Sequence, residues 1–393
     1  MRTTGRQEWE LGRGAGLRFP LGGAPLGPPV VTSVYYDVAG SLAAAGITLL
    51  CRTGQGRSVW QLTLPAGGSA LELEAEGPPS QAPQVLLDLL RAHLRHGPLE
   101  PVAELRSTRR SEGPGGGDGS EAPSGRSPFE ELRSRLGRQL QEIERHDPGT
   151  RLGRDPESLH DMRVAVRRLR ALLRAGKKLV ATDTAELDGR LKQLGRILGE
   201  VRDLDVLLAR LEAEASKLPG DDARHGRSLL AALRTERSCA RARLLGALRS
   251  DDYLALLEDT AGTVEALEPS GTDSTLDGLA DRAFVKLDKA VCGLPDDPAD
   301  EELHRVRKVG KRARYAAELA GRKEFVRQAK KLQDVLGEHQ DAVVASEQLR
   351  RLAAAAAPEQ ALAAGRLVER EEQRRAEARQ TWHAAWQRLL ETT

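Results

Sequence analysis

Aromatic residues are scarce in this sequence: they make up 3% of its 393 residues, and only two methionines accompany them. All-β chains depend on β-branched and aromatic side chains, so this scarcity argues against an all-β fold. Leucine, alanine, arginine and glutamate are abundant, and these residues favour helices that pack through Leu and Ala.

The chain also lacks a cysteine framework and any long apolar run. Cys51, Cys239 and Cys292 are too far apart for a metal-ligand spacing or a disulfide scaffold, as the reducing cytoplasm permits. No run approaches ~20 apolar residues, and the opening "MRTTGRQEWELGRGAG" has no apolar signal core. We therefore expect a soluble, cytoplasmic protein with no membrane partner.

Charge of one sign is not in excess overall, because 60 Lys and Arg residues face 58 Asp and Glu residues. A preference for an anionic partner would therefore depend on local clusters of charge. The length of the chain predicts two or three structural units.

A Gly-, Ser- and Pro-rich stretch divides the chain into unlike halves. Residues 109–126 cannot bury enough apolar surface to order themselves and are predicted to form a flexible linker. Before them, "PVVTSVYYDV", "SVWQLTLPAG" and "ALELEAEG" are typical of strands, residues 82–97 of a helix, and "PVAELRSTRR" of one more strand. Residues 1–108 are thus predicted to form a small α+β domain.

After the linker nearly every segment has helical periodicity. Ser127 is predicted to cap the first helix together with Glu130, and the acids near Asp155 and Asp300 suit the starts of two basic helices. The further predicted helices cover about 184–201, 203–217, 221–249, 251–267, 276–292, 323–338, 340–356 and 358–391. The fold class is therefore mainly α.

Two motifs occur twice in the same order. "LHDMRVAVRRLR" from Leu159 matches "LHRVRKVGKRAR" from Leu303, and "KQLGRILGEVRDLDVLL" (192–208) matches "KKLQDVLGEHQDAVVAS" (330–346). The offsets are 144 and 138 residues. We infer two duplicated helical bundles that form a pseudo-symmetric pair, with repeat one at about 127–268 and repeat two at about 275–392.

Each basic helix carries a stripe of positive charge beside its apolar face, since a helix turns about 100° per residue. The stripes consist of His160, Arg163, Arg167, Arg170 and Arg174 in the first helix and of His304, Arg307, Lys308, Lys311 and Arg314 in the second. A solvated face is the alternative, but such a face normally mixes signs because like charges repel. Acids are nearly absent from both stripes, which favours a polyanion site.

The histidine at the start of each stripe either has a structural role or binds the anion. Its repetition favours anion binding, and a nearby phosphate would raise the pKa of the histidine. Glu200, Asp203, Glu338 and Asp341 recur in the second motif. They are either metal ligands or partners of arginines and caps of new helices, and their spacing favours the second interpretation.

"HDMRVAVRRLR", "LGEVRDLDVL", "LHRVRKVGKRARYAAEL" and "KKLQDVLGEHQD" resemble both halves of the CHAD domain, the conserved-histidine α-helical domain, over about 127–391. The resemblance implies a duplicated four-helix bundle with a basic cleft that binds inorganic polyphosphate without catalysis or cofactor. Association with polyphosphate granules is left open. The family's basic positions correspond here to His160, Arg163, Arg167, Arg170, Lys192, His304, Arg307, Lys311, Arg314 and Lys330, and Arg174, Lys308 and Lys331 lie beside them.

"SVYYDVAGSLAAAGITLLCRTG" and "VWQLTLP" resemble the CYTH, or triphosphate tunnel, domain. Members of that family act as metal-dependent triphosphatases or adenylate cyclases inside a barrel of charged strands. Here Gly12 and Thr63 stand where the family has Lys, Arg52 alone remains of a basic strand, and the later acidic strands are missing. We therefore expect a truncated CYTH-like domain without catalytic residues or a metal.

Polyphosphate binding is the leading prediction. The alternatives are a metal-dependent triphosphatase acting through the N-terminal domain and non-specific nucleic-acid binding. Binding of single strands is disfavoured because aromatic stacking residues are nearly absent from the stripes, and binding of duplexes stays open.

Overall fold

A computed structural model describes residues 31–54, 56–66, 69–107, 127–271 and 275–392. The chain divides into two compact units. The first comprises Met1–Ser124, Arg138–Val166 and Ser250–Glu258, and the second comprises Gly125–Gly137, Arg167–Arg249 and Asp259–Thr393. The linker predicted at 109–126 and Gly12 lie outside the described residues, so the predicted domain boundary stays a prediction.

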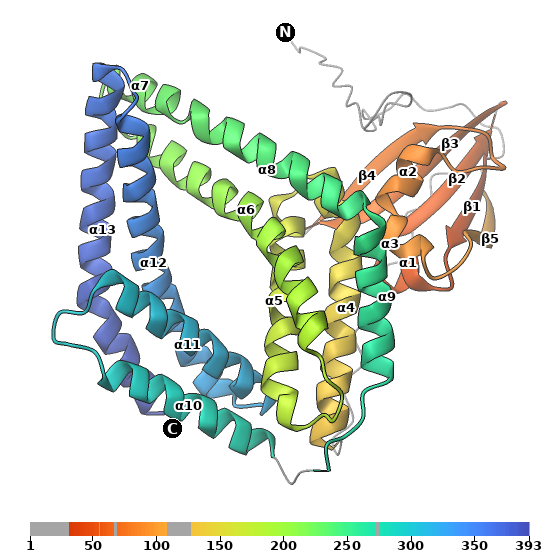
Figure 1. Cartoon of the computed structure of the whole chain (residues 1–393). Coiled ribbons are helices and arrows are strands. Elements are labelled where there is room, and N and C mark those ends of the chain that lie inside the picture. The colour runs from red at the N-terminus through yellow and green to blue at the C-terminus, as the bar shows by residue number, and fades with distance from the viewer. Residues whose placement is uncertain (1–30, 55, 67–68, 108–126, 272–274, 393) are drawn as a thin grey trace. The chain divides into compact units, whose positions relative to one another are not determined.

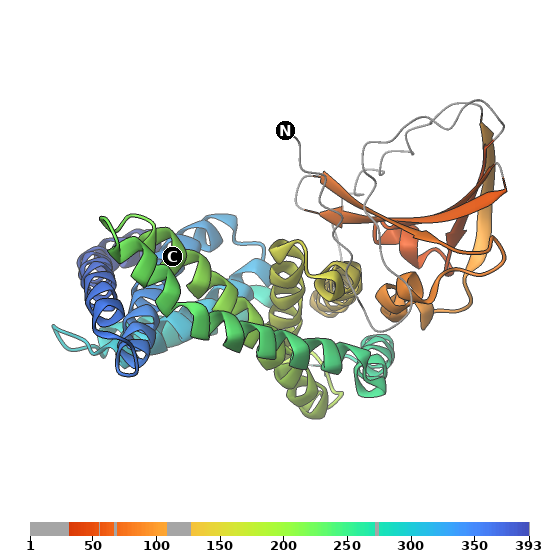
Figure 2. The ribbon, with the colours of Figure 1, turned by 90° about the horizontal axis from the view of Figure 1, so that it is seen from above.

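The first unit contains one antiparallel sheet. Its strands are β1 (Val31–Asp37), β2 (Thr48–Gly54), β3 (Arg57–Ala66), β4 (Ser69–Glu76) and β5 (Glu100–Ser107). Their spatial order is β4-β3-β2-β1-β5, and each neighbouring pair is antiparallel. Figure 2 shows the sheet with short helices on one face. The predicted strands are confirmed, and β2 is the strand that the sequence indicated only through its CYTH likeness.

Three short helices cover one face of this sheet: α1 (Ser41–Ala44), α2 (Gln84–Leu89) and α3 (Arg91–Leu94). Trp60, Leu62 and Leu73 from the strands pack with Leu86 and Leu90 in a single core. The single helix predicted at 82–97 was wrong in its continuity, because Leu90 departs from helical backbone geometry between α2 and α3.

Helical residues of the first unit contact the sheet domain through a buried carboxylate. Glu144 is 7% exposed and pairs with Arg95, and His96 Nε2 lies 3.1 Å from Glu144 Oε2. His93 Nε2 lies 3.1 Å from the Glu144 carbonyl, and Leu152 packs against the core of the sheet. The sheet and residues 138–166 therefore form one compact body.

Ten α-helices follow in the described chain after residue 127. They are α4 (Pro128–Leu152), α5 (Pro156–Ala175), α6 (Ala185–Ala215), α7 (Asp222–Leu229), α8 (Ala231–Arg249), α9 (Asp251–Glu265), α10 (Leu276–Cys292), α11 (Asp300–Leu319), α12 (Lys323–Ala353) and α13 (Pro358–Leu390). The predicted cap is confirmed: Glu130 N donates to Ser127 Oγ at 3.2 Å, and Ser127 N donates to Glu130 Oε2 at 2.8 Å. The mainly α fold class with a small α+β part is confirmed.

The helices agree with the repeat in length. The basic helices α5 and α11 both have 20 residues, and the helices that follow them, α6 and α12, both have 31. The predicted breaks near 202 and 339 were wrong. Gly199 and Gly337 lie close to these positions without interrupting α6 or α12. In α6, buried Leu198, Val201, Leu208 and Leu211 continue one apolar stripe through the position of the expected break.

Two apolar cores stabilise the second unit. One joins α6, α7 and α8 to α12 and α13, and the other joins α10 and α11 to α12 and α13. The long α12 contributes to both cores, so it holds α11 and α6 within the same body (Figure 1). Within the residues that the structure describes, no helix combines the length and apolarity that a membrane crossing requires.

Candidate anion-binding site

The two basic helices expose their charged stripes because their apolar residues are used for packing. In α5, Met162, Val166 and Leu169 are fully buried. In α11, Leu303 and Val306 are 1% exposed. All residues of the two basic stripes are half-buried or exposed, so the predicted amphipathic geometry of both helices is confirmed.

The C-terminal half of α5 contacts α11 within the second unit. Arg167 Nε donates to the Tyr315 hydroxyl at 2.7 Å, and Tyr315 is only 4% exposed. The Arg314 guanidinium lies over the same ring, 5.0 Å from its centroid. Arg167 of repeat one and Arg314 of repeat two therefore meet at one tyrosine.

Arg307 lies against α12 at the glycine of the second motif. A Cβ at Gly337 would stand 3.6 Å from Arg307 Nη2, so the guanidinium contacts the backbone side of the buried Gly337. Lys308, the next residue of α11, is exposed, and Lys311, one turn after Arg307, is half-buried. The second motif thus borders the basic helix of its own repeat.

His304 stands among cations. Burial lowers the pKa of His304 below its usual value of 6.5, and the charges of Lys308, Arg307 and Lys311 lower it further. A hydrogen bond with the Gln340 side chain acts in the opposite direction. His304 Nδ1 is buried and has no hydrogen-bond partner among the described residues. The neutral imidazole therefore becomes easier to protonate only when an anion approaches.

The pH dependence of binding should report His304. A polyanion bound beside His304 would raise the pKa of His304 from its lowered value in the free chain, so that binding would take up a proton. Affinity then rises as the pH falls through the pKa of the complex, and the gain is complete below the pKa of the free chain, itself below 6.5. We expect His304→Ala to lose more affinity for polyphosphate at about pH 5.5 than at about pH 8. His225→Ala, on α7, is the matched control, and an equal loss at both pH values would contradict the role given to His304.

An acid from α6 neutralises the end of the first stripe. Arg170 Nε lies 3.0 Å from Asp188 Oδ1, and Arg174 Nη2 lies 2.7 Å from Asp188 Oδ2. Sequence reasoning missed this partner because the near-absence of acids was judged along α5 alone. Its signal was available, since Asp188 lies one turn before Lys192 at the start of the next helix.

Removing this acid should strengthen anion binding. Asp188→Asn leaves Arg170 and Arg174 with their full charge, and we expect affinity for polyphosphate to rise roughly threefold to tenfold, since charge-assisted hydrogen bonds become available to the ligand. Equilibrium titration measures this gain in affinity, and a misfolded variant would show a loss instead. Asp259→Asn is the control, because Asp259 pairs with Arg190 outside the stripes. A loss of affinity in Asp188→Asn would mean that Asp188 holds the arginines in their binding positions.

The acids of the second motif pair with arginines. Arg243 Nη2 lies 3.1 Å from Glu200 Oε2, and Arg210 Nη2 lies 2.8 Å from Glu338 Oε1, which confirms that part of the interpretation. The capping role was wrong for Asp203, which lies inside α6.

Asp341 likewise lies inside α12, where it caps no helix. Burial raises the pKa of Asp341, and Glu338 and Asp203 act in the same direction against the charges of Arg307 and Arg210. Among the described residues no group of three or more His, Cys, Asp or Glu side chains could hold a metal ion.

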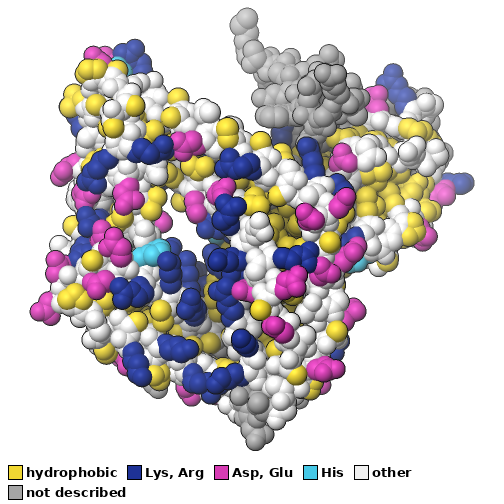
Figure 3. Space-filling model, viewed as in Figure 1, with side chains coloured by type: hydrophobic (Ala, Val, Ile, Leu, Met, Phe, Trp, Pro, Cys, Tyr) yellow, Lys and Arg dark blue, Asp and Glu magenta, His cyan; other side chains and the backbone are white. Residues whose placement is uncertain are grey.

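The remaining predicted residues lie on the same helices. Lys192 is exposed on α6, and Lys330 and Lys331 are exposed on α12. His160 and Arg163 are half-buried in the N-terminal half of α5 and belong to the first compact unit. Figure 3 shows Lys and Arg side chains gathered over α11 and around the hollow between α6 and α11.

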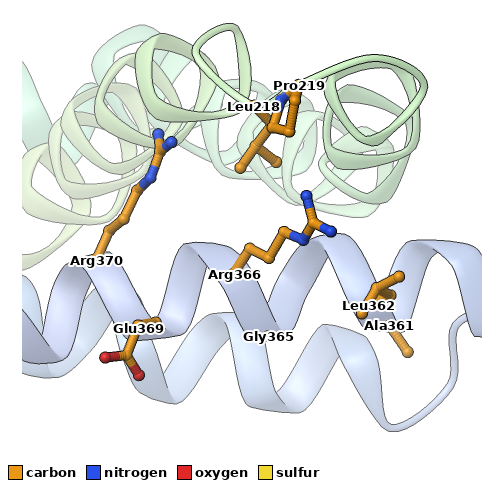
Figure 4. A pocket seen from close by; sticks show the side chains of 8 residues that line it. All are labelled: Leu218, Pro219, Ala361, Leu362, Gly365, Arg366, Glu369 and Arg370. Carbon is orange, nitrogen blue, oxygen red and sulfur yellow. The ribbon is translucent and has the colours of Figure 1, made fainter.

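A surface pocket lies elsewhere and uses none of the predicted residues. Leu218 and Pro219 face α13 across it, and Arg366 and Arg370 border it (Figure 4). Arg366 pairs with Asp222 at 2.5 Å, and Arg370 lies 3.2 Å from Glu214 Oε2. Because both guanidinium groups have carboxylate partners, the basic surface of α5 and α11 is the stronger candidate for an anion.

Known proteins resemble the chain over most of its length. The family model described as CHAD domain matches residues 134–350. Two uncharacterized proteins of Mycobacterium tuberculosis, from strains CDC 1551 / Oshkosh and H37Rv, are each 27% identical to the chain, over 91% of it and 89% of their own length.

Two solved structures share the helical fold. PptA from Streptomyces chartreusis is 25% identical with a TM-score of 0.57, over 66% of this chain and 99% of that one. The CHAD domain from the plant Ricinus communis is 29% identical with a TM-score of 0.55, over 67% of this chain and 91% of that one.

Proposed function

The chain belongs to the CHAD domain family, and from this membership we propose that it binds inorganic polyphosphate, without catalysis, at the basic surface of α5 and α11. The N-terminal sheet, residues 31–106, is consistent with a partial CYTH-like domain. Membership in the family supports the ligand class, and the charges of the described site support where it binds.

The observation that carries the proposal is a set of cations without carboxylate partners. Among the described residues, no ion pair involves the following members of the predicted site: Arg167, Lys192, Lys308, Arg314, Lys330 and Lys331. Most other arginines of the second unit have an acid within 4 Å, as Arg210 has Glu371 and Arg375 has Asp300. Unneutralised cations collected on neighbouring helices raise the local concentration of an anionic ligand.

The residue types suit a chain of phosphates. Arginine donates bidentate hydrogen bonds to phosphate oxygens, and lysine supplies a mobile point charge. Neither residue type needs a base or a sugar for this recognition. A polymer can also engage several weak sites at once, which a single phosphate ion cannot do.

The triphosphatase alternative depends on the N-terminal sheet. Its register places Thr63 opposite Glu72 in β4 and Arg52 opposite Val59 in β3. Thr63 is the position at which the family has a lysine, so the residue opposite Glu72 carries no charge here. A catalytic metal would need several carboxylates around it. We therefore propose that the sheet does not hydrolyse triphosphate.

Location in the cytoplasm and at polyphosphate granules stays a prediction.

Titration of the full chain with fluorescent long polyphosphate, against duplex DNA at equal salt, tests the proposal. We expect saturable binding of polyphosphate and at least tenfold weaker binding of DNA, whose charge spacing and stiffness differ. Parallel incubation with Mg²⁺ or Mn²⁺ and tripolyphosphate should release no phosphate. Equal affinity for both polymers would favour nucleic-acid binding, and metal-dependent phosphate release would favour the triphosphatase.

A further inference from the structure

We propose that Tyr315 is a positioning residue that holds one arginine of each repeat ready for a shared phosphate ligand. The inference rests on the proposed function and adds to it the device by which the two stripes act as one site. It concerns Arg167 and Arg314, whose side chains meet at the Tyr315 ring.

The contacts of Tyr315 use its two chemically different parts. Its hydroxyl accepts a hydrogen bond from Arg167 Nε at 2.7 Å, and its ring lies 5.0 Å from the Arg314 guanidinium carbon. The ring is 4% exposed, so packing fixes its place. Since Nε carries the hydrogen bond, the two Nη groups of Arg167 are left for an anion, and these groups form the fork that phosphate oxygens accept.

Tyr315 orients both arginines without neutralising them. A carboxylate could fix an arginine equally well, as Asp188 does for Arg170 and Arg174, but its negative charge would oppose an anionic ligand. A phenol and an aromatic face are neutral, so Arg167 and Arg314 keep their full positive charge. Orientation before binding lowers the conformational entropy lost when the ligand arrives.

The device occurs once rather than twice. Applying the 144-residue offset of the first motif places Ala171 of repeat one where repeat two has Tyr315. Arg314 Nε is buried and has no hydrogen-bond partner among the described residues, while the Arg314 guanidinium contacts the Tyr315 ring. The pair of repeats is therefore asymmetric at this point, and repeat two supplies the residue that orients arginines from both.

Tyr315→Phe tests the proposal, because it removes the hydroxyl that holds Arg167 and keeps the ring under Arg314. We expect roughly tenfold weaker binding of long polyphosphate, the effect of losing one charge-assisted hydrogen bond. The slope of log affinity against log salt should not change, since the number of cations is unchanged. Tyr36→Phe is the matched control, because its hydroxyl donates to the Pro79 carbonyl at 3.3 Å in the sheet.

A double-mutant cycle separates orientation from a general structural effect. Tyr315→Phe should add nothing to the loss caused by Arg167→Ala, since the hydroxyl acts through that arginine. Arg167→Lys keeps the charge and loses the Nε donor, so it should weaken binding as Tyr315→Phe does, and it decides the question if Tyr315→Phe does not fold.

Native affinity in Tyr315→Phe or in Arg167→Lys would overturn the role of Tyr315 while leaving polyphosphate binding intact. Additive losses in the cycle of Tyr315→Phe with Arg167→Ala would do the same. Failure of the unaltered chain to bind polyphosphate would instead refute the proposed function itself.

Discussion

The double variant Arg307→Glu, Lys311→Glu should bind long polyphosphate roughly 10²–10⁴-fold more weakly than the native chain. Each substitution removes a charge-assisted hydrogen bond to phosphate worth about 1.5–3 kcal/mol, and each new carboxylate repels the polyanion. The same result is expected for Arg163→Glu with Arg167→Glu in repeat one, because we expect one polymer to contact both repeats.

The control for this prediction keeps the change in net charge and moves it away from the stripes. Lys323→Glu with Arg388→Glu reverses two exposed cations, one at the start of α12 and one near the end of α13. That variant should bind nearly as the native chain does, and thermal unfolding should show that all variants are folded. If one reversed repeat abolished binding while the other left affinity and salt dependence unchanged, only one repeat would hold the ligand.

Salt should weaken binding by orders of magnitude. Six cations of the predicted site form no ion pair among the described residues, and a polyanion that contacts several of them releases the counterions bound to both partners. For DNA, six contacts correspond to a loss of roughly 10³ in affinity between about 50 and 200 mM salt, and polyphosphate should change in the same direction. Titration over this range gives the slope, and a flat dependence would contradict binding through the stripes.

The sequence predicted the features that depend on a single element. The two basic helices, their apolar faces and the repeat could be predicted because 3.6-residue periodicity and matched motifs are local properties. Strand β4 could be predicted from the alternation in "ALELEAEG", where Leu73 is buried and Glu72 and Glu74 are less so. Strands β1 and β3 could be predicted from β-branched and aromatic residues, whereas only the CYTH likeness indicated β2. The sequence did not predict the full length of α6 and α12, because a charged residue such as Asp203 can stand at a helix N-terminus as well as inside a helix.

The contacts that shape the site are tertiary and could not be predicted from the sequence. A helical projection assigns Arg170 to a face of α5, but it does not tell that Asp188 from α6 reaches that face. Tyr315 likewise lies beside the second stripe in projection, and only a tertiary contact within the second unit brings Arg167 to its hydroxyl. Which cations keep their charge for a ligand is thus decided by neighbouring helices.

Calorimetric titration of the full chain with polyphosphates of defined length tests most directly whether one polymer contacts both repeats. We expect one long polymer bound per chain, with an affinity far above that of tripolyphosphate, because a long polymer engages both stripes at once. Equal affinity for tripolyphosphate and the long polymer, counted per site, or two long polymers bound independently to each chain, would contradict it.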